Sequence, residues 1–456
     1  MADNRLLEEL NARLKAKSIY DIRQVARQVG VPRPTEGRKE RLIEEILNIA
    51  SGRTDPASQS ASGAPPKSAE YDRQLVVDIL RCREISLSSF GAESSEGHVM
   101  QVSDAVVSNE PTEGLLFKSD GVWYLNSVNG GEVFVSDSFV TRFSLREGDY
   151  VKGALRRKPD SGLAGLVNVS AVNGVLPEAV SSRLDFEALA PVYPIKKLSS
   201  SRGGNDVAGR MIDLLCPVAA GQRVLVVAPH GTGKTAILKV IAEGIEKNHP
   251  EVKIIVALID ARPEEAVDFK RSFKRADVIA STMDAGARVH VKTAEIALEH
   301  AKRLTELCKD VAFILDDLTK LTLAYNCGAQ VGSRLDTAAL DAAKKFISSA
   351  RNTEQGASLT IISALSEGGD EIENAVYCGL KDAGNMRITL SQKLARLRIL
   401  PPIDIEKSAA SGDERILTRE ELDTAVALRR KHEDGENVIK LFENTSSYEE
   451  LRSRLK

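Results

Sequence analysis

A short loop between an apolar strand and a helix carries the residues best suited to chemistry. The run Ala228-Pro229-His230-Gly231-Thr232-Gly233-Lys234-Thr235 follows the apolar stretch 224–227 and precedes a helical pattern. In this setting the loop amides and the helix N-terminus hold phosphate groups. Lys234 is expected to reach the β- and γ-phosphates, and the Thr235 hydroxyl to bind Mg²⁺. The loop predicts a nucleoside triphosphate site, although Ala228 replaces the more common first glycine.

Two neighbouring aspartates supply the second half of such a site. Asp316 ends the apolar run 311–315, where a carboxylate can hold the metal ion, and Asp317 follows it directly. The run Asp260-Ala261-Arg262 ends another apolar strand, at a place where an acidic residue would orient the attacking water. Ala261 cannot act as a base. These residues therefore predict nucleotide binding more firmly than hydrolysis.

The elements that position these residues alternate between strands and helices. Strands without polar alternation are buried on both faces, which is typical of a parallel sheet covered by helices. We therefore expect residues 210–456 to form an α/β domain. Its apolar runs and helical patterns lie at 224–227, 234–245, 254–259, 278–280, 291–307, 311–315, 335–350 and 359–362.

Length and composition indicate a soluble, multidomain protein. The 456 residues correspond to roughly three domains of about 150 residues each. The net charge of −3 gives no bulk attraction to nucleic acid, so an anionic partner needs a local basic patch. The five cysteines are scattered and lack metal-ligand spacing, as expected for reduced thiols. No apolar run approaches the ~20 residues of a membrane span, so we expect a cytoplasmic protein without a membrane partner.

The first third of the chain divides into segments of different character. Apolar residues recur at helical spacing within residues 1–50, which predicts a small N-terminal helical subdomain. Residues 51–69 are rich in Ser, Ala, Gly and Pro, and we interpret them as a disordered linker. Residues 70–110 give no clear pattern and are treated as an insertion of uncertain structure.

Short alternating strands separated by Gly, Asn and Asp predict a small β-barrel over residues 111–178. A connector, 179–209, joins it to the α/β domain. Aromatic side chains on a small barrel above a basic rim can stack the bases of single-stranded nucleic acid. Alternatively, these aromatics fill the barrel core. The candidate RNA-binding residues of the barrel are Val122, Trp123, Tyr124, Phe134 and Arg156.

Several longer motifs resemble the bacterial Rho family of transcription termination factors. They are CPVAAGQRVLVVAPHGTGKT, LIDARPEE, ADVIASTMD, KRLTELCKDVAFILDDLTKL with AYN, SSARNTEQGASLTII and GNM. The resemblance is dense over about residues 111–405 and looser over 1–50. It implies a homohexameric, RNA-dependent ATPase and helicase of the RecA-like class that uses ATP and Mg²⁺ and acts on the RNA polymerase complex. It also implies an OB- or cold-shock-like fold for the barrel.

The same resemblance assigns roles to individual residues. Asp316 would lie at the Mg²⁺ ion. In the central channel, the segment 331–336, including Arg334, would grip RNA, and Lys381 would belong to the second RNA-contacting loop. The residues expected to line the nucleotide are Ala219, Ala220, Gly221, Gln222, Arg223, Val224, Gly231, Thr232, Gly233, Lys234, Thr235, Ala236 and Arg262.

The chain departs from the family pattern at its catalytic positions. Ala261 stands where the family has its catalytic glutamate, and Gly231 where it has an additional lysine. The arginine finger aligns near 411–412, with Arg415 a few residues later, and the channel loop is shorter than in the family. General-base assistance is worth roughly 10²–10⁴ in rate and an arginine finger roughly 10³–10⁵. Nucleotide binding should therefore survive these changes better than hydrolysis.

Two hypotheses follow. In the first, the chain is an ATP-driven termination factor in which Asp317 orients the water and Arg415 reaches the γ-phosphate of a neighbouring subunit. In the second, it is a hydrolysis-impaired RNA-binding ring, or a modulator of an active Rho, that holds ATP without efficient turnover. A recombinase or rotary ATPase of the same fold is disfavoured by the barrel and by the long Rho-like motifs.

Overall fold

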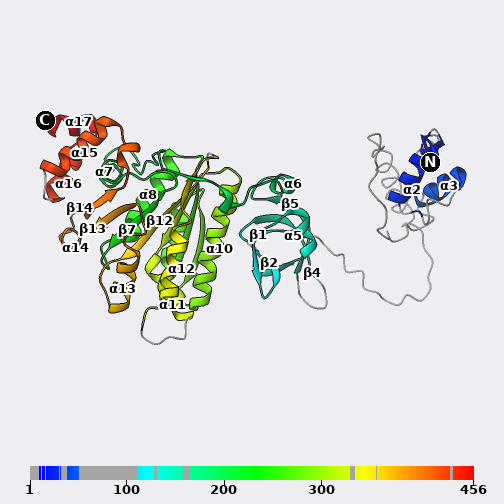
Figure 1. Cartoon of the computed structure of the whole chain (residues 1–456), viewed down its shortest axis with the longest axis horizontal. Coiled ribbons are helices and arrows are strands. Elements are labelled where there is room, and N and C mark those ends of the chain that lie inside the picture. Colours follow the sequence, from blue (N-terminus) through cyan, green and yellow to red (C-terminus); the bar gives the residue numbers. More distant parts are fainter. Residues whose placement is uncertain are drawn as a thin grey trace. The chain divides into compact units, whose positions relative to one another are not determined.

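The structure is a computed structural model, and it forms two compact units, residues 1–105 and 106–456 (Figure 1). Each unit is described by itself. The predicted linker and insertion, 51–69 and 70–110, lie outside the described residues except for Glu110. The described residues are 10–11, 13–15, 17–29, 31, 38–50, 110–127, 131–157, 164–328, 334–355, 357–431 and 435–455.

The described part of the first unit is helical, as predicted. Helices α2 (Ile19–Val29) and α3 (Lys39–Ala50) pack on each other, and residues 10–11 and 13–15 are also helical. Leu10 and Leu14 are buried with Ile22 and Ile46 in a small apolar core. The helical spacing of these residues places them on one face, and burying that face holds the unit together.

The second unit begins with a closed barrel. Its strand order is β1-β2-β3-β5-β4, and a parallel pairing of β3 with β5 closes it. Alternate residues point inward, so Leu116, Leu125, Val133 and Val151 form its aliphatic core. The elements are β1 (Glu110–Ser119), β2 (Val122–Ser127), β3 (Glu132–Val135), α5 (Asp137–Phe143), β4 (Tyr150–Arg157), β5 (Ala164–Val172) and α6 (Pro177–Val180).

A nine-stranded sheet, counted over the described residues, follows the barrel. Its central strands are parallel in the order β13-β7-β12-β10-β8-β9. β14 adds an antiparallel edge that the sequence patterns did not predict. The strands are β6 (Pro191–Val192), β7 (Arg223–Ala228), β8 (Lys253–Ala261), β9 (Asp277–Thr282), β10 (Val311–Asp316), β11 (Arg351–Thr353), β12 (Ser358–Ser366), β13 (Met386–Leu390) and β14 (Ile403–Ala410).

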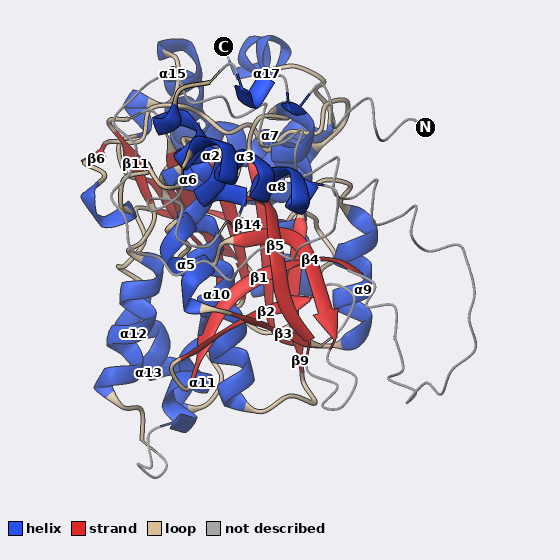
Figure 2. Ribbon diagram, turned by 90° about the vertical axis from the view of Figure 1, so that its right-hand side faces the viewer, coloured by secondary structure: helices blue, strands red, loops and turns tan. Residues whose placement is uncertain are grey.

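Helices cover both faces of this sheet (Figures 1 and 2). Val224 and Val226 of β7 pack with α7, α8 and α9 on one face, and Leu225 and Val227 pack with α10 to α13 on the other. This is why the strand is apolar at every position from Val224 to Ala228. The helices are η1 (Phe186–Ala188), α7 (Val207–Leu215), α8 (Lys234–Asn248), α9 (Pro263–Ser272), α10 (Ala287–Glu306), α11 (Leu318–Gly328), α12 (Thr337–Ile347), α13 (Glu371–Leu380), α14 (Gln392–Arg396), η2 (Asp413–Arg415), α15 (Arg419–Lys431), α16 (Gly435–Glu443) and α17 (Tyr448–Leu455).

The last three helices, which the sequence patterns did not predict, pack around α7. Arg210 of α7 donates to the carbonyl oxygen of Phe442 over 3.1 Å, and Tyr448 donates to the carbonyl oxygen of Arg210 over 3.1 Å. None of the helices in the described part of the chain combines the length and apolar character that a membrane span requires.

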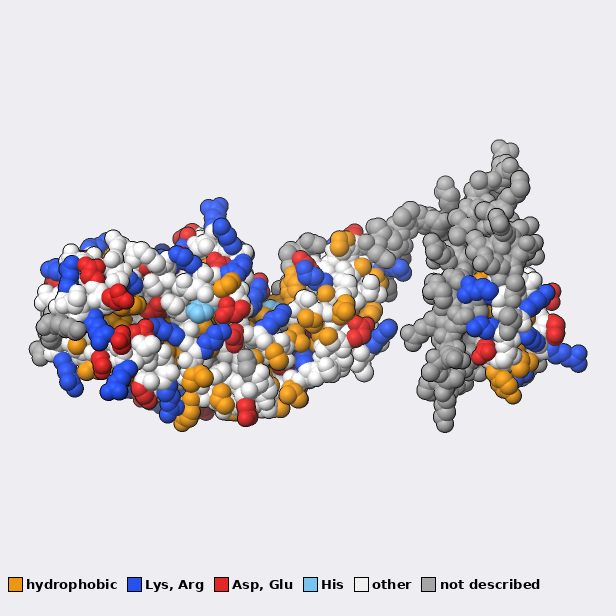
Figure 3. All heavy atoms as spheres, turned by 90° about the horizontal axis from the view of Figure 1, so that it is seen from above, with side chains coloured by type: hydrophobic (Ala, Val, Ile, Leu, Met, Phe, Trp, Pro, Cys, Tyr) orange, Lys and Arg blue, Asp and Glu red, His pale blue; other side chains and the backbone are white. Residues whose placement is uncertain are grey.

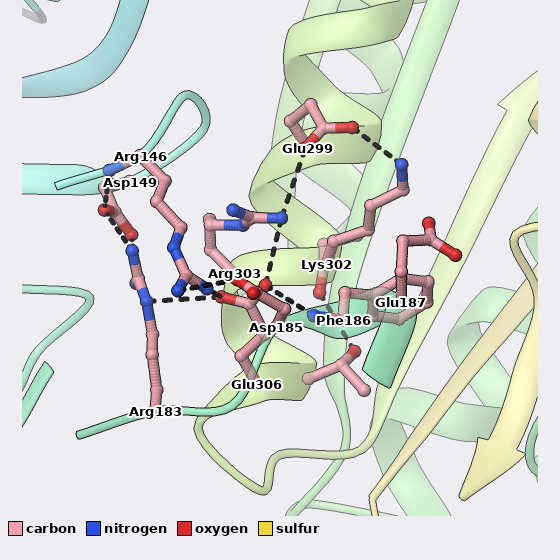
Figure 4. A network of polar contacts seen from close by, with 12 residues as sticks. Arg146, Asp149, Arg183, Asp185, Phe186, Glu187, Glu299, Lys302, Arg303 and Glu306 are labelled. Carbon is pink, nitrogen blue, oxygen red and sulfur yellow. Dashed lines mark hydrogen bonds and ion pairs between the residues drawn. The ribbon is translucent and has the colours of Figure 1, made fainter. Parts of the chain in front are cut away.

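A buried charged cluster fixes the barrel against α10 (Figure 4). The carboxylate of Glu306, with no exposed side-chain surface, lies 3.1 Å from Arg146 of the barrel and 3.2 Å from Arg183 of the connector. It also accepts the amide of Phe186 over 2.9 Å. Gly148 packs so closely that a Cβ there would lie 2.4 Å from the backbone of α10. Barrel and α/β domain therefore share a close-packed junction.

Candidate nucleotide site and RNA-binding face

The predicted phosphate loop has the geometry that its glycines allow. Strand β7 ends at Ala228, and Gly233 caps the first turn of α8. Gly231 and Gly233 have φ values of +75° and +95°, a region that L side chains rarely adopt. The Thr232 hydroxyl donates to the carbonyl oxygen of Pro229 over 2.7 Å and closes the turn. The N-terminus of a 15-residue helix thus points into the loop and favours bound phosphate.

Neighbouring strands bring the predicted catalytic side chains to this loop. Lys234 Nζ donates to Asp317 Oδ2 over 3.1 Å and also donates to the hydroxyl of Ser366. The Thr235 hydroxyl donates to Asp316 Oδ2 over 2.7 Å. Ser366 pairs with Ala228 in the sheet, which explains its proximity to the loop. The sequence did not single out Ser366, because only the register of two distant strands places it there.

The pair Thr235 and Asp316 offers a hydroxyl and a carboxylate oxygen side by side. Mg²⁺ prefers such oxygen ligands and commonly takes its remaining ligands from phosphates and water. Within the described ranges no three His, Cys, Asp or Glu side chains cluster to hold a metal alone. Burial, and secondly the charge of Asp317, raise the pKa of Asp316 to about 6. A cation at this point would favour the charged carboxylate, so these residues fit a nucleotide-bound Mg²⁺.

The strand end at Ala261 carries no acidic side chain at position 261 that could orient the attacking water. Ala261 is 4% exposed and belongs to the apolar core between the sheet and α9. Beside it, Lys320 Nζ donates to the carbonyl oxygen of Asp260 over 2.6 Å. Lys320 is a second residue that the sequence did not single out, and it places a cation at the carboxyl edge of the sheet. Arg262 follows at the start of α9 on the same edge.

Six of the residues expected to line the nucleotide lie away from the phosphate loop of their own chain. Gln222 and Arg223 lie at the opposite end of β7 from the loop, separated by the length of a six-residue strand. Arg223 Nε donates to the carbonyl oxygen of Ala383 over 3.0 Å, and the Gln222 side chain accepts the amide of Ala219 over 2.8 Å. The two ends of a strand lie at opposite edges of the sheet, so residues at the start of β7 are far from the loop that follows its end. The residues separated in this way from Gly231, Thr232, Gly233, Lys234, Thr235 and Ala236 are Ala219, Ala220, Gly221, Gln222, Arg223 and Val224.

Arg415 also lies at this second edge. Strand β14 runs antiparallel and ends at Ala410, opposite Met386, and Met386 pairs with Val224 at the start of β7. The guanidinium of Arg415 lies 4.1 Å from the centre of the Tyr193 ring. Arg415 therefore cannot reach the phosphate loop of its own chain.

The two predicted channel segments are described only in part. Residues 331–333 lie outside the described residues. Arg334 is exposed, and its carbonyl oxygen accepts the Asn326 side chain over 3.3 Å. Lys381 caps the end of α13 and is partly exposed.

The barrel places its candidate residues on two different faces. Tyr124 and Phe134 are cross-strand partners on the outer face, with Phe134 45% exposed. Trp123 points the other way and packs against the barrel core, as the alternative interpretation of the aromatics foresaw. Arg156 is exposed on β4, and Val122 shares the outer face with Tyr124. Hydrophobic side chains gather on the barrel in the view of Figure 3, whereas charged ones are scattered over the α/β domain.

The fold and the loop define a P-loop nucleotide-binding protein joined to an RNA-binding barrel. Residues 209–410 match the model of the ATP synthase alpha/beta family, nucleotide-binding domain. Residues 118–178 match the Rho termination factor, RNA-binding domain. These matches confirm the predicted fold classes.

Relatives that match this chain over most of their length identify its family. The chain is 39% identical over 343 residues to transcription termination factor Rho of Bacillus subtilis (strain 168), covering 72% of this chain and 80% of the relative. It is 33% identical over 427 residues to transcription termination factor Rho of Aquifex aeolicus (strain VF5), covering 91% and 87%. The chain belongs to the Rho family, and the resemblance inferred from its motifs is confirmed.

Proposed function

We propose that the protein is a Rho-type transcription termination factor, which binds nascent single-stranded RNA and uses ATP to move along and release it. The observation that carries the proposal is the assembly of Lys234, Thr235 and Asp316 around a phosphate loop in a chain that also holds an RNA-binding barrel. The relatives of similar length carry the same name.

The phosphate loop would hold ATP by its amides, by the N-terminus of α8 and by Lys234. Thr235 and Asp316 would hold Mg²⁺, which would neutralise the phosphate charge. Asp317 Oδ2 lies 3.1 Å from the ammonium nitrogen of Lys234. When Lys234 turns to the phosphates, Asp317 loses this partner beside the γ-phosphate. We infer that its carboxylate then orients the attacking water in place of the residue missing at Ala261.

Arg415 would complete the site of a neighbouring copy. It lies at the sheet edge opposite its own phosphate loop, and its side chain is 46% exposed. A ring of identical subunits, a homohexamer in the Rho pattern, would bring this edge to the next nucleotide. Lys381 and Arg334 would line the channel of that ring, and the RNA polymerase complex would be its target.

A second candidate is a ring that binds ATP and RNA with little turnover. The specific observation in its favour is Ala261, which is buried among apolar residues. In this case Asp317 serves only as the ion-pair partner of Lys234.

Phosphate release from ATP, measured with and without a pyrimidine-rich RNA, tests both candidates. The termination factor should release phosphate faster with RNA, and Asp317→Asn should abolish the increase. Robust RNA-dependent release excludes the second candidate. Absence of release in the natural protein, with turnover gained in Ala261→Glu, excludes the first.

A further inference from the structure

Three aromatic rings form a line across the outer face of the barrel. Phe117, Tyr124 and Phe134 occupy neighbouring positions on β1, β2 and β3. The ring centres are 5.8 Å apart for Phe117 and Tyr124, and 6.5 Å apart for Tyr124 and Phe134. All three lie outside the barrel core. Phe134, at one end of this line, is exposed, so a base can stack on its ring.

Helix α10 of the α/β domain covers the other end of this line. Phe117 is 2% exposed, and Lys292 Nζ lies 3.9 Å from the centre of its ring. An ammonium group over an aromatic face is held by the ring quadrupole. The barrel's aromatic line therefore ends on a cation that belongs to the other domain.

Lys292 forms no ion pair with the acidic residues nearest to it on α10, Glu295 and Glu299. Glu299 pairs with Lys302 at 2.7 Å and with Arg303 at 3.3 Å, and Glu295 accepts the Tyr325 hydroxyl over 3.1 Å. No ion pair of the described residues includes Lys292. Its charge remains available to an anionic partner.

The position of Lys292 relative to the barrel is fixed by the junction. Glu306, further along α10, is held by Arg146 and Arg183, and His300 Nδ1 lies 2.8 Å from the carbonyl oxygen of Gly148. Because Gly148 packs so closely against the backbone of α10, the barrel and α10 cannot slide past each other. Lys292 and the aromatic line thus form one rigid surface.

A cleft of about 930 Å³ continues from this point between the barrel and the α/β domain. Its wall includes Lys118, Lys302 and Lys345 in addition to Lys292. Five acidic residues also line it: Glu187 is paired with Arg351 at 3.2 Å and Glu299 with Lys302 at 2.7 Å, whereas Asp120, Glu147 and Glu295 form no ion pair among the described residues. The cleft gives a polynucleotide a path away from the aromatic line.

We propose that RNA bound on the barrel continues onto the α/β domain, with Lys292 binding a backbone phosphate next to the bases stacked on Tyr124 and Phe134. Single-strand binding combines the stacking of bases on aromatic rings with cationic contacts to the backbone. The proposal rests on the proposed RNA binding and adds to it a phosphate contact supplied by the ATPase domain.

The test is the affinity of the full-length protein for an oligocytidylate, measured as a function of salt concentration. Lys292→Met keeps an apolar chain over Phe117 but removes the charge. Loss of one phosphate contact should weaken binding roughly three- to tenfold at low salt. The slope of log affinity against log salt should fall by about 0.7. Lys292→Arg should restore both.

Two matched variants make the result specific. Lys274→Ala removes an exposed lysine from the same domain and should change neither quantity. Tyr124→Ala should weaken binding while leaving the salt slope intact, because stacking carries no charge. An unchanged affinity and slope in Lys292→Met would overturn the inference. Failure of the natural protein to bind the oligonucleotide would instead overturn the proposed RNA binding.

Discussion

At the scale of single residues, Asp317 is the side chain that we propose to link nucleotide binding to hydrolysis. Its carboxylate is 4% exposed and contacts the lysine on which phosphate binding depends. Its second oxygen accepts the amide of Lys320 over 2.7 Å, which fixes the side chain in position. A buried, oriented carboxylate beside the γ-phosphate position can orient water, and it also competes with phosphate for Lys234.

Asp317→Asn should therefore separate the two steps. The rate of RNA-stimulated phosphate release should fall by a factor of roughly 10²–10⁴, the usual contribution of general-base assistance. Affinity for a non-hydrolysable ATP analogue should be retained or increased, because a negative charge leaves the site and Lys234 is freed. Asp268→Asn, in an ion pair on the exposed face of α9, is the control. Equal turnover in the two variants would mean that Asp317 is not the water-orienting group.

On the barrel, Tyr124 and Phe134 should carry the stacking energy. Base stacking on an aromatic ring is worth roughly 1–3 kcal/mol. Phe134→Ala should therefore weaken oligocytidylate binding while leaving the RNA-independent phosphate release unchanged. Val167→Ala, an exposed apolar residue of β5, is a matched control. Equal affinity for RNA in both variants would place the binding face elsewhere.

The sequence predicted the part of the site that is formed by residues close together in the chain. Lys234 and Thr235 follow a strand and a glycine-rich loop directly, so their placement follows from local chain geometry. Asp316 was predictable because it ends an apolar run. Gln222 and Arg223 lie at the other edge of the sheet from the loop, because the length of the six-residue strand β7 separates them from it. Ser366 was missed because only tertiary pairing brings it to the loop.

At the scale of elements, α10 links the barrel to the carboxyl edge of the sheet. Its first turns carry His290, whose Nδ1 lies 2.9 Å from the hydroxyl of Ser281 at the end of β9. Its last turn carries Glu306. The sequence predicted this helix from its period, but it gave no sign of the barrel junction. That junction depends on Arg146, Arg183 and Glu306, which lie far apart in the chain.

Glu306→Ala should destabilise the protein. Arg183 keeps Asp149 and Arg146 keeps Asp185, but the buried amide of Phe186 loses its acceptor. A buried polar group left unpaired typically costs about 1–3 kcal/mol. Denaturant unfolding followed by circular dichroism measures the change. Glu251→Ala removes a carboxylate of an exposed ion pair with Lys196 and should cost less than about 1 kcal/mol. Similar losses in the two variants would show that the buried cluster contributes little.

Gly148→Ala tests the close approach of the barrel to α10. The φ value of Gly148 is +86°, and an added Cβ would meet the backbone of Glu299 and His300 at 2.4 Å. Gly121 has nearly the same φ, +83°, with nothing within 4 Å of its Cβ position. Gly121→Ala therefore measures the backbone strain alone. Gly148→Ala should cost about 1–3 kcal/mol more in the free energy of unfolding, and equal costs would argue against a close-packed junction.

At the scale of the whole molecule, the catalytic groups lie on two opposite edges of one sheet. The phosphate loop, Asp316 and Asp317 occupy the carboxyl edge, and Arg415 occupies the other. Arg415 therefore cannot reach the phosphate loop of its own chain. In the ring that we propose, a complete site would combine the loop of one copy with Arg415 of the next.

Mixing two inactive variants tests this arrangement. Lys234→Ala lacks the lysine of the phosphate loop, and Arg415→Ala lacks the arginine proposed to reach the γ-phosphate of the neighbouring subunit. Each protein alone should therefore release little phosphate. In a mixed ring, the intact loop of an Arg415→Ala subunit can face the intact Arg415 of a Lys234→Ala subunit. RNA-stimulated release should then rise above the sum of the two separate proteins after they are denatured and refolded together. If the mixture stays inactive while its subunits still co-assemble, Arg415 does not act between copies, and another cation, with Lys320 the first candidate, must serve the γ-phosphate.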